Sequence, residues 1–534
     1  MRTSRPQALN ALVASAVLAG CVTFGTEKGP PKGTYRERLF GFASLLRMED
    51  RRAYDPLLAG RTAASPDPWL RAKTASAVFR LKDPDASVYL PVLLKDAETR
   101  VRRAATFGAG LSGDARLLRF LIAALEDPDV ETAANAAEAL GKIGGKDATD
   151  ALLAALPKST GPRAACALAL FRRPEARTVA ALLAAFGEEP LAPELRRAVV
   201  YALSRTPDPA AASALRAVLR KGNDDPTVVS WAARAAGLLE DEESASDLVR
   251  LAASRDVSVS VQALTALNSL SKKSALSRGD ELTRSARDVA LVRANDPLPG
   301  VAIAGLRLLG ALPDSPASRA TLEENLLRKG WRGQTALVSL TRLDVAPSPE
   351  AALKRLDAAA ASDSLELRLG AVESLEFLKG ESAAKEQVAT ALLSDRLARV
   401  RAAALSSLSK QKAPKRSAYM LAGLIDREPA VRAVALEESA PLVDEAGGEF
   451  LRVWKVAYEE SFALKEPDFI VSALDAAAAR KAGGRDLVRA HEDDADAVTR
   501  EKARRLLVEK YGAAPGSFGP IPVLTRLSME DYRE

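Results

Sequence analysis

The amino-acid sequence predicts an all-α protein, namely a right-handed α-solenoid of about thirteen helix pairs. Alanine and leucine dominate a chain in which 47% of the residues are hydrophobic and only 5% are aromatic, a composition that suits closely packed helices. Apolar residues recur at the spacing of one helix face. Acidic-Pro pairs precede several of these apolar runs, and neighbouring runs are about 29 to 33 residues apart.

The stretch 125–156 shows the repeating unit most clearly. Asp127 and Pro128 fit the N-cap and the first position of one helix, and Gly144-Gly145 ends that helix because glycine tolerates a positive φ. Asp147 is expected to cap a second helix. Neither helix can bury its apolar face alone, so the unit needs copies of itself on both sides. We expect the second helices of the units to line the concave face of the array.

The predicted solenoid covers residues 35–511. Residues 35–59 are expected to form an N-terminal cap, and the repeating units run from Trp69 to Tyr511. The polar stretch 271–288 breaks the period, and it predicts either an exposed loop or a lengthened second helix.

A second signature places an aspartate six residues before an arginine in three of the units. These pairs are Asp96 and Arg102, Asp395 and Arg401, and Asp426 and Arg432. Together with the run Val400, Arg401 and Ala403, the pattern resembles HEAT repeats, in the short bacterial form often called PBS-lyase-like. In that family an arginine and an aspartate of adjacent repeats form a ladder along the array, and the resemblance implies the same structural role here. The alternative is a row of arginines that binds anions.

Several units depart from this pattern. Glu131, Val229 and Ser260 stand where the arginine is expected. We therefore expect the ladder to be interrupted in the middle of the array.

The N-terminus predicts an export signal followed by a tether. Residues 1–20 contain two arginines and an apolar run of about a dozen residues, too short to span a membrane but suited to a signal peptide. The run ends in Leu18-Ala19-Gly20-Cys21, which resembles the bacterial lipobox, and the resemblance implies that Cys21 becomes lipid-modified. An ordinary secretory signal is the alternative. Residues 21–34 are rich in glycine and proline and predict a flexible tether.

These features predict a lipid-anchored protein of the bacterial cell envelope, attached to the membrane through Cys21. Val22 follows the cysteine, at a position where an aspartate would favour retention at the inner membrane. We therefore expect the periplasmic side of the outer membrane.

Residues that carry catalysis are scarce. The single histidine, His491, lies among acids, so a metal site is one reading and a solvated acidic turn is the other. No phosphate-binding loop or dinucleotide fingerprint is present. The net charge is only +6 for 76 basic and 70 acidic residues, too small and dispersed for a nucleic-acid partner. We predict no enzyme activity, no cofactor, no metal and no small-molecule substrate.

The cysteine and tryptophan side chains predict core positions. Cys166 falls on the apolar face of a repeat helix. Core packing is likewise expected for the four tryptophans, although exposed tryptophans are also common anchors for partners. They are Trp69, Trp231, Trp331 and Trp454.

The C-terminus, residues 512–534, reads as a Pro/Gly linker and tail. Its layout resembles bacterial lipoproteins in which a HEAT array precedes a cyclophilin-type prolyl isomerase domain, which this sequence does not contain. The alternative is a tail that folds back on the last repeat. The sequence as a whole predicts a lipid-anchored HEAT-repeat scaffold for an unidentified protein partner. Two alternatives are the non-catalytic part of an envelope folding factor associated with such an isomerase, and a structural spacer without a specific partner.

Overall fold

The computed structural model describes residues 32–513 and residue 518. Short gaps interrupt this range at 51–53, 82–85, 159–160, 206–207, 223, 273–275, 277–279, 329, 346, 379–382, 411–414, 447 and 495. The predicted signal peptide, Cys21 and most of the predicted tether lie outside the described residues, as does the tail apart from 512, 513 and 518. The last three residues of the predicted tether belong to the first described helix.

Helices are the only regular elements in the described part of the chain, and they form two rows. In the first row each helix packs against the next member of the same row. The first row consists of α2 (Lys32–Asp50), α4 (Pro68–Arg80), α6 (Thr99–Ser112), α8 (Val130–Ile143), α10 (Arg163–Leu170), α12 (Pro193–Arg205), α14 (Pro226–Leu239), α16 (Val257–Leu270), α18 (Pro299–Leu309), α20 (Trp331–Val345), α22 (Leu365–Ser374), α24 (Ala398–Lys410), α26 (Pro429–Ala446), α28 (Pro467–Ala479) and α30 (Ala497–Tyr511).

The second row alternates with the first along the chain. It consists of α3 (Pro56–Ala63), α5 (Leu90–Leu93), α7 (Leu118–Ala124), α9 (Lys146–Ala155), α11 (Ala176–Phe186), α13 (Ala212–Lys221), α15 (Ala245–Ala252), α17 (Glu281–Ala294), α19 (Pro316–Leu326), α21 (Pro349–Ala360), α23 (Ala383–Leu393), α25 (Arg416–Leu424), α27 (Gly448–Leu464) and α29 (Gly484–Arg489). Single 3₁₀ turns precede α5, α7, α13 and α15 and follow α22; they are η1 (Ala86–Tyr89), η2 (Ala115–Leu117), η3 (Pro209–Ala211), η4 (Glu242–Ser244) and η6 (Leu375–Phe377).

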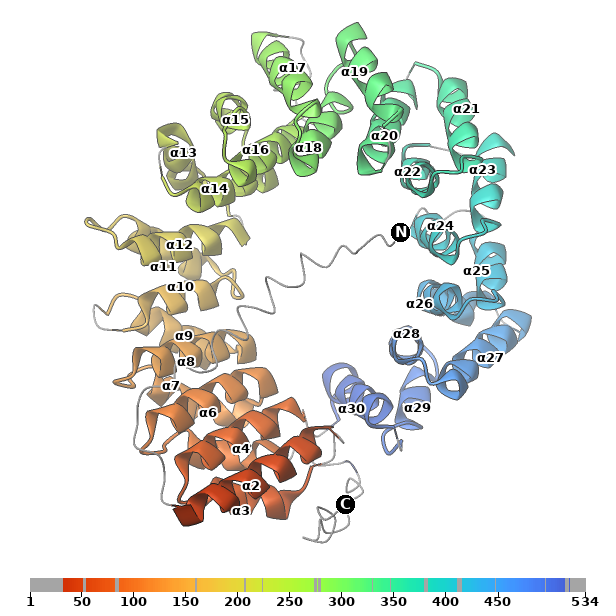
Figure 1. Ribbon diagram of the computed structural model, residues 1–534. Coiled ribbons are helices and arrows are strands. Elements are labelled where there is room, and N and C mark those ends of the chain that lie inside the picture. The colour runs from red at the N-terminus through yellow and green to blue at the C-terminus, as the bar shows by residue number, and fades with distance from the viewer. Residues whose placement is uncertain are drawn as a thin grey trace.

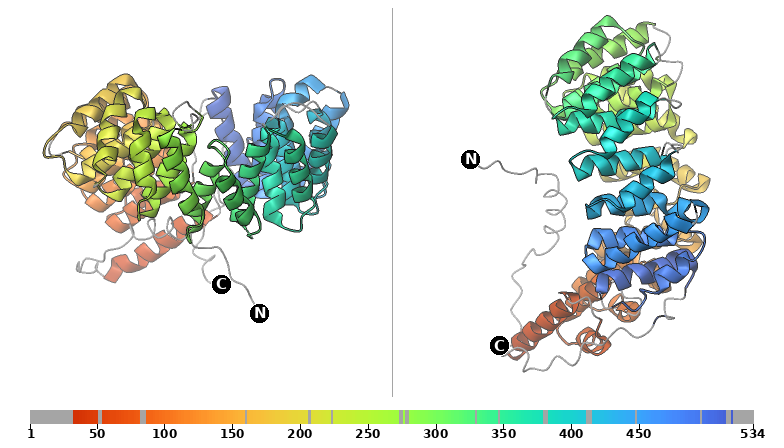
Figure 2. Two further views of the ribbon diagram at one scale, coloured as in Figure 1. Left: turned by 90° about the horizontal axis from the view of Figure 1, so that it is seen from above. Right: turned by 90° about the vertical axis from the view of Figure 1, so that its right-hand side faces the viewer.

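The pairs from α4 and α5 to α28 and α29 number thirteen in the described ranges, with α2 and α3 ahead of them and α30 behind. This arrangement confirms the predicted all-α solenoid. The array curves round until its last helices approach the first ones in the view of Figure 1, and Figure 2 shows that the two ends are offset along the axis of the curve. The array is therefore an open superhelix.

The first row lies on the inside of the curve and the second row on the outside (Figure 1). The expectation that the second helices line the concave face is therefore wrong. The physical reason is the size of the residues at the helix contacts. A Cβ atom added to Gly110 of α6 would lie only 2.9 Å from Cα of Ala139 of α8, and one added to Gly237 of α14 only 2.7 Å from Cα of Ala266 of α16. Small residues let the inner helices approach closely, and the row with the closer spacing becomes the inner side of the curve.

The start of α8 also differs from the prediction. Its N-cap is Asp129, whose carboxylate accepts a hydrogen bond from the backbone N–H of Thr132. Asp127 instead accepts from the N–H of Asp129 and faces the preceding repeat. The next helix begins at Lys146 with Gly145 as its N-cap, so Asp147 lies inside its first turn.

The core is a seam rich in alanine and leucine between the two rows, made of three clusters that follow one another along the chain. Cys166 is fully buried in this seam, as predicted, and burial raises the pKa of its thiol to about 12. Phe518, the one described residue of the tail beyond Ala513, packs against the C-terminal part of the core. Within the described residues, no helix is both long enough and apolar enough to cross a membrane.

Candidate functional site

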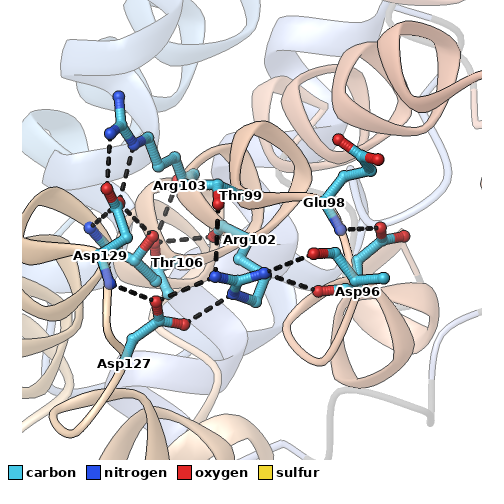
Figure 3. A network of polar contacts seen from close by, with 10 residues as sticks. Asp96, Glu98, Thr99, Arg102, Arg103, Thr106, Asp127 and Asp129 are labelled. Carbon is cyan, nitrogen blue, oxygen red and sulfur yellow. Dashed lines mark hydrogen bonds and ion pairs between the residues drawn. The ribbon is translucent and has the colours of Figure 1, made fainter.

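Arg102 shows how neighbouring repeats are joined (Figure 3). Its Nε and Nη2 atoms donate to the two carboxylate oxygens of Asp127 in the following repeat, at 2.7 and 3.1 Å. Its Nη1 atom donates to the backbone carbonyls of Asp96 and Ala97, both at 2.9 Å, in the loop that leads into its own helix. One guanidinium therefore ties together two consecutive loops.

The aspartate of each predicted pair contacts the arginine of the repeat before it. Asp96 pairs with Arg71 at 2.6 Å, and it also accepts from the N–H of Glu98. Asp395 pairs with Arg368 at 2.7 Å, and Asp426 pairs with Arg401 at 2.7 Å. Each of these aspartates lies in the loop before its own helix and pairs with an arginine of the preceding repeat.

Arg432 departs from this arrangement. It donates to the backbone carbonyl of Asp426 at 2.6 Å, but its ion-pair partner is Glu460 at 3.5 Å. Sequence reasoning also missed Arg71 and Arg368, which follow a serine by six residues where the pattern has an aspartate. In both cases the main-chain carbonyl of the serine accepts the hydrogen bond, so the side chain at that position is free to vary.

At two positions where the ladder arginine is missing, arginines from other helices take over its contacts with the loop carbonyls. Ser260 stands at one such position, and Arg293 of α17 donates to the backbone carbonyl of Ser254 at 2.9 Å. Ala302, which follows Val301 in the next repeat, also stands where a ladder arginine is expected, and Arg332 of α20 donates to the carbonyls of Asp296 and Pro297, six and five residues before it. These replacements come from positions that no local sequence pattern marks.

The ladder arginines are buried or partly buried and already paired, which argues against the anion-binding alternative. Arg401 and Arg368 are both buried. Burial raises the pKa of Asp426, but hydrogen bonds from Arg401 and from the N–H of Glu428 outweigh it and hold the pKa below its ordinary value. An added anion would have to displace a carboxylate that is already bound. The ladder is therefore part of the fold, and a binding surface has to be sought elsewhere.

The concave face of α12 exposes one stripe. Arg197, Tyr201 and Arg205 are partly or fully exposed, whereas almost all residues between them are buried. The helix packs against α10 and α14 at its sides and against α11 from the outer row. The stripe points away from the core, so it faces the inside of the curve.

Aromatic side chains of three consecutive inner helices meet on this face. Tyr201 lies edge-on to Phe171, at the end of α10, with ring centroids 5.6 Å apart, and edge-on to Trp231 of α14 at 5.0 Å. All three rings are partly exposed. Leu168 and Leu238 flank the row with 41% and 52% of their surface exposed. Tyrosine, tryptophan and arginine are the residues that most often anchor protein partners.

The tryptophans do not share one role. Trp454 is fully buried, as predicted, and stacks on Tyr458 with centroids 5.4 Å apart. Trp331, at the start of α20, is 56% exposed, so its predicted core position is wrong. Trp69 is also exposed, because it lies in the first turn of α4. The guanidinium of Arg100 lies 4.1 Å from the centroid of its ring. A residue in a first turn can share the helical spacing of the core face and still lie beyond the edge of the neighbouring helix.

His491 is held by ring contacts and one acid. It stacks on Phe462 with centroids 3.8 Å apart, and its Nδ1 lies 3.0 Å from a carboxylate oxygen of Asp494. In the described ranges, no group of three or more His, Cys, Asp or Glu side chains is arranged to hold a metal ion.

Comparison with known proteins identifies part of the array. Residues 86–170 match the HEAT-repeat family. This segment runs from η1 to the end of α10, and the same pairing of an inner with an outer helix continues in the HEAT-like units beyond it. No curated protein matches the sequence.

Many solved structures are similar to the chain, and two of them illustrate the likeness. The complex of CpcE and CpcF of phycocyanin lyase from Nostoc sp. PCC7120 shares 20% identity at a TM-score of 0.29, covering 50% of this chain and 97% of that chain. Importin beta shares 14% identity at a TM-score of 0.47, covering 95% of this chain and 66% of that chain. Neither likeness assigns a partner or an activity to this chain.

Proposed function

We propose that the chain is a non-enzymatic, protein-binding scaffold of the bacterial cell envelope, held at a membrane by lipid on Cys21. The observation that carries the binding role is the row of partly exposed aromatic rings on the concave face, Phe171, Tyr201 and Trp231. A solenoid buries contacts between its two rows and between neighbouring repeats, so large rings left partly exposed on its concave face are available to a partner. The HEAT repeats supply a long rigid surface on which such a partner can lie.

Photocrosslinking in cells tests the binding face. A photoreactive amino acid at Leu168 or Leu238 of the concave face should give protein adducts. The matched controls are Leu57 of α3 and Val92 of α5, which belong to the outer row and are 79% and 69% exposed. These controls are more exposed than the test positions, so adducts at the controls alone, or equally at all four positions, would contradict the proposal.

Membrane attachment is tested by fractionation. The Cys21→Ala variant should move from the membrane fraction to the soluble fraction, because it lacks the cysteine that would carry the membrane-binding acyl chains. Retention of this variant with membranes would show a different attachment. Turnover of a prolyl peptide by the purified chain would contradict the non-enzymatic role. The alternative association with a cyclophilin-type isomerase has no supporting observation among the described residues.

A further inference from the structure

Three arginines beside the aromatic row have no acidic side chain within ion-pair distance in the part of the chain that the structure describes. They are Arg172, which follows α10, Arg205 of α12 and Arg234 of α14. Arg197, on the same stripe of α12, instead pairs with Asp225 at 3.1 Å and with Glu194 at 3.4 Å. The fold thus uses one concave arginine internally and leaves three available to a partner.

These arginines and the aromatic rings form one surface, which we call the concave row. Its members are Phe171, Arg172, Tyr201, Arg205, Trp231 and Arg234. The guanidinium of Arg172 lies over the ring of Phe171 at 4.4 Å, and that of Arg205 is 5.9 Å from the same ring. Each of the three inner helices, counting the residues that directly follow α10, therefore contributes one ring and one guanidinium to this surface.

The sign of the charge changes farther along the inner helices. Arg307 is the one exposed residue of the stretch 301–310 in α18. At α22 and η6 the exposed side chains are Glu373 and Glu376. The cationic part of the concave face therefore ends before α22, so a partner segment that fits it carries its negative charge on the side of α10 to α14.

The ring geometry favours a polypeptide over a nucleic acid. The planes of Phe171 and Tyr201 meet at 89°, and those of Tyr201 and Trp231 at 70°. Neighbouring rings of the row are therefore steeply inclined to one another, so the row does not offer the parallel ring faces on which successive bases stack. Edge-packed rings beside guanidinium groups suit apolar side chains next to carboxylates.

We propose that the concave row binds an acidic, extended segment of a partner protein, in which carboxylates pair with the three arginines and apolar side chains contact the rings. This inference rests on the proposed function and names the chemistry of the partner. Packed helices are about 8–10 Å apart, and an extended chain advances about 3.3 Å per residue. One acidic residue about every third position therefore aligns with the arginines of successive inner helices.

Fluorescence anisotropy with a defined probe tests this proposal on the purified protein. The probe is a labelled peptide of about 12 residues, which spans about 40 Å when extended, with aspartate at every third position and leucine or phenylalanine between. We expect it to bind the wild-type protein in a salt-dependent manner, and we expect a peptide with lysine in place of aspartate not to bind. The triple variant Arg172→Glu, Arg205→Glu and Arg234→Glu should bind the acidic peptide about tenfold more weakly or worse.

The matched control makes the same charge change on the outer row, with Arg220→Glu, Lys221→Glu and Arg284→Glu on α13 and α17. All three side chains are exposed, so this variant should retain wild-type affinity, and circular dichroism checks that both triple variants remain helical. Equal binding by both variants, or no binding to the wild type, would overturn the proposal. Tighter arginine-dependent binding of a single-stranded oligonucleotide would replace it with a nucleic-acid partner. If the peptide does not bind but crosslinks still form at Leu168 and Leu238, the proposed function stands and only the partner's chemistry is wrong.

Discussion

Arg401 illustrates, at the scale of the residue, how a buried charge joins two repeats. It pairs with both carboxylate oxygens of Asp426 at 2.7 Å and donates to the backbone carbonyl of Asp395 at 2.8 Å. Removing one member of a buried ion pair leaves the other charge buried without a partner. This lowers the stability of the fold by more than the intact pair contributes to it. These loops can therefore be buried only when adjacent repeats stack so that the ion pairs of the ladder form.

The Arg401→Ala substitution should destabilise the contact between α24 and α26 by about 3 kcal/mol, because it leaves the Asp426 carboxylate and two loop carbonyls without their donor. Hydrogen exchange of the amides in these two helices measures this effect, since a repeat array unfolds in parts. Arg399→Ala, on the exposed side of the same helix, is the control and should change little. Equal effects of the two substitutions would show that the pair does not join the repeats.

At the scale of the element, the inner helices are spaced by the smallest side chains. Gly110 contacts Ala139, Gly141 contacts Ala169 and Gly237 contacts Ala266, so the same kind of contact joins three pairs of neighbouring inner helices. These contacts join α6 with α8, α8 with α10, and α14 with α16. Glycine lowers the intrinsic stability of a helix by about 1 kcal/mol relative to alanine, which indicates that the close approach compensates for this cost.

Gly237→Ala should destabilise the protein by about 1–2 kcal/mol, even though alanine is the better helix former. The reason is that the new methyl group would lie 2.7 Å from Cα of Ala266, and backbone has to move to admit it. The control is Gly300→Ala in the first turn of α18, where an added Cβ meets nothing within 4 Å. This control should be unchanged or slightly more stable. Thermal unfolding compares the two variants, and a stabilising Gly237→Ala would show that the inner row is not closely packed.

At the scale of the whole molecule, the ladder makes stability depend on pH. Burial raises the pKa of Asp96 and of Asp127, but hydrogen bonds from Arg71 and Arg102 outweigh it, so both pKa values lie below the ordinary 3.8. A hydrogen bond from Arg103 also lowers the pKa of Asp129, against the effect of burial. The unfolded chain then binds more protons than the folded chain at acid pH. The stabilisation is complete above the ordinary pKa and is lost as pH falls through the lowered values.

The thermal midpoint should therefore vary little from about pH 5 to 8 and fall steeply below about pH 4. Asp127→Asn removes one titrating group, so its difference in stability from the wild type should shrink as the pH is lowered from about 5 to 3. Thermal unfolding at a series of pH values measures both curves. A constant difference across this range would mean that the Asp127 carboxylate does not contribute through its pairing with Arg102.

Much of the fold follows from local patterns along the chain. Helical spacing of apolar residues and acidic-Pro starts predict the helix pairs, and Cys166 and Trp454 lie in the core where their spacing places them. The arginine at a fixed distance after an aspartate marks loops such as Asp96 to Arg102 before any partner is known. The resemblance to HEAT repeats implied that the partner belongs to an adjacent repeat, and Asp96 contacts Arg71 of the repeat before it. Arg71 itself was not marked, because a serine stands six residues before it.

The sequence by itself determined that this protein is an array of short amphipathic helix pairs, since periodicity and capping act within a few residues of one another. Only the tertiary structure decided which row lies inside the curve, because both helices of a pair have apolar faces and the closer contacts at residues such as Gly237 distinguish them. Only the tertiary structure likewise revealed the concave row and the replacement of missing ladder arginines by Arg293 and Arg332. These groups come together from separate repeats, so their meeting depends on how the repeats stack.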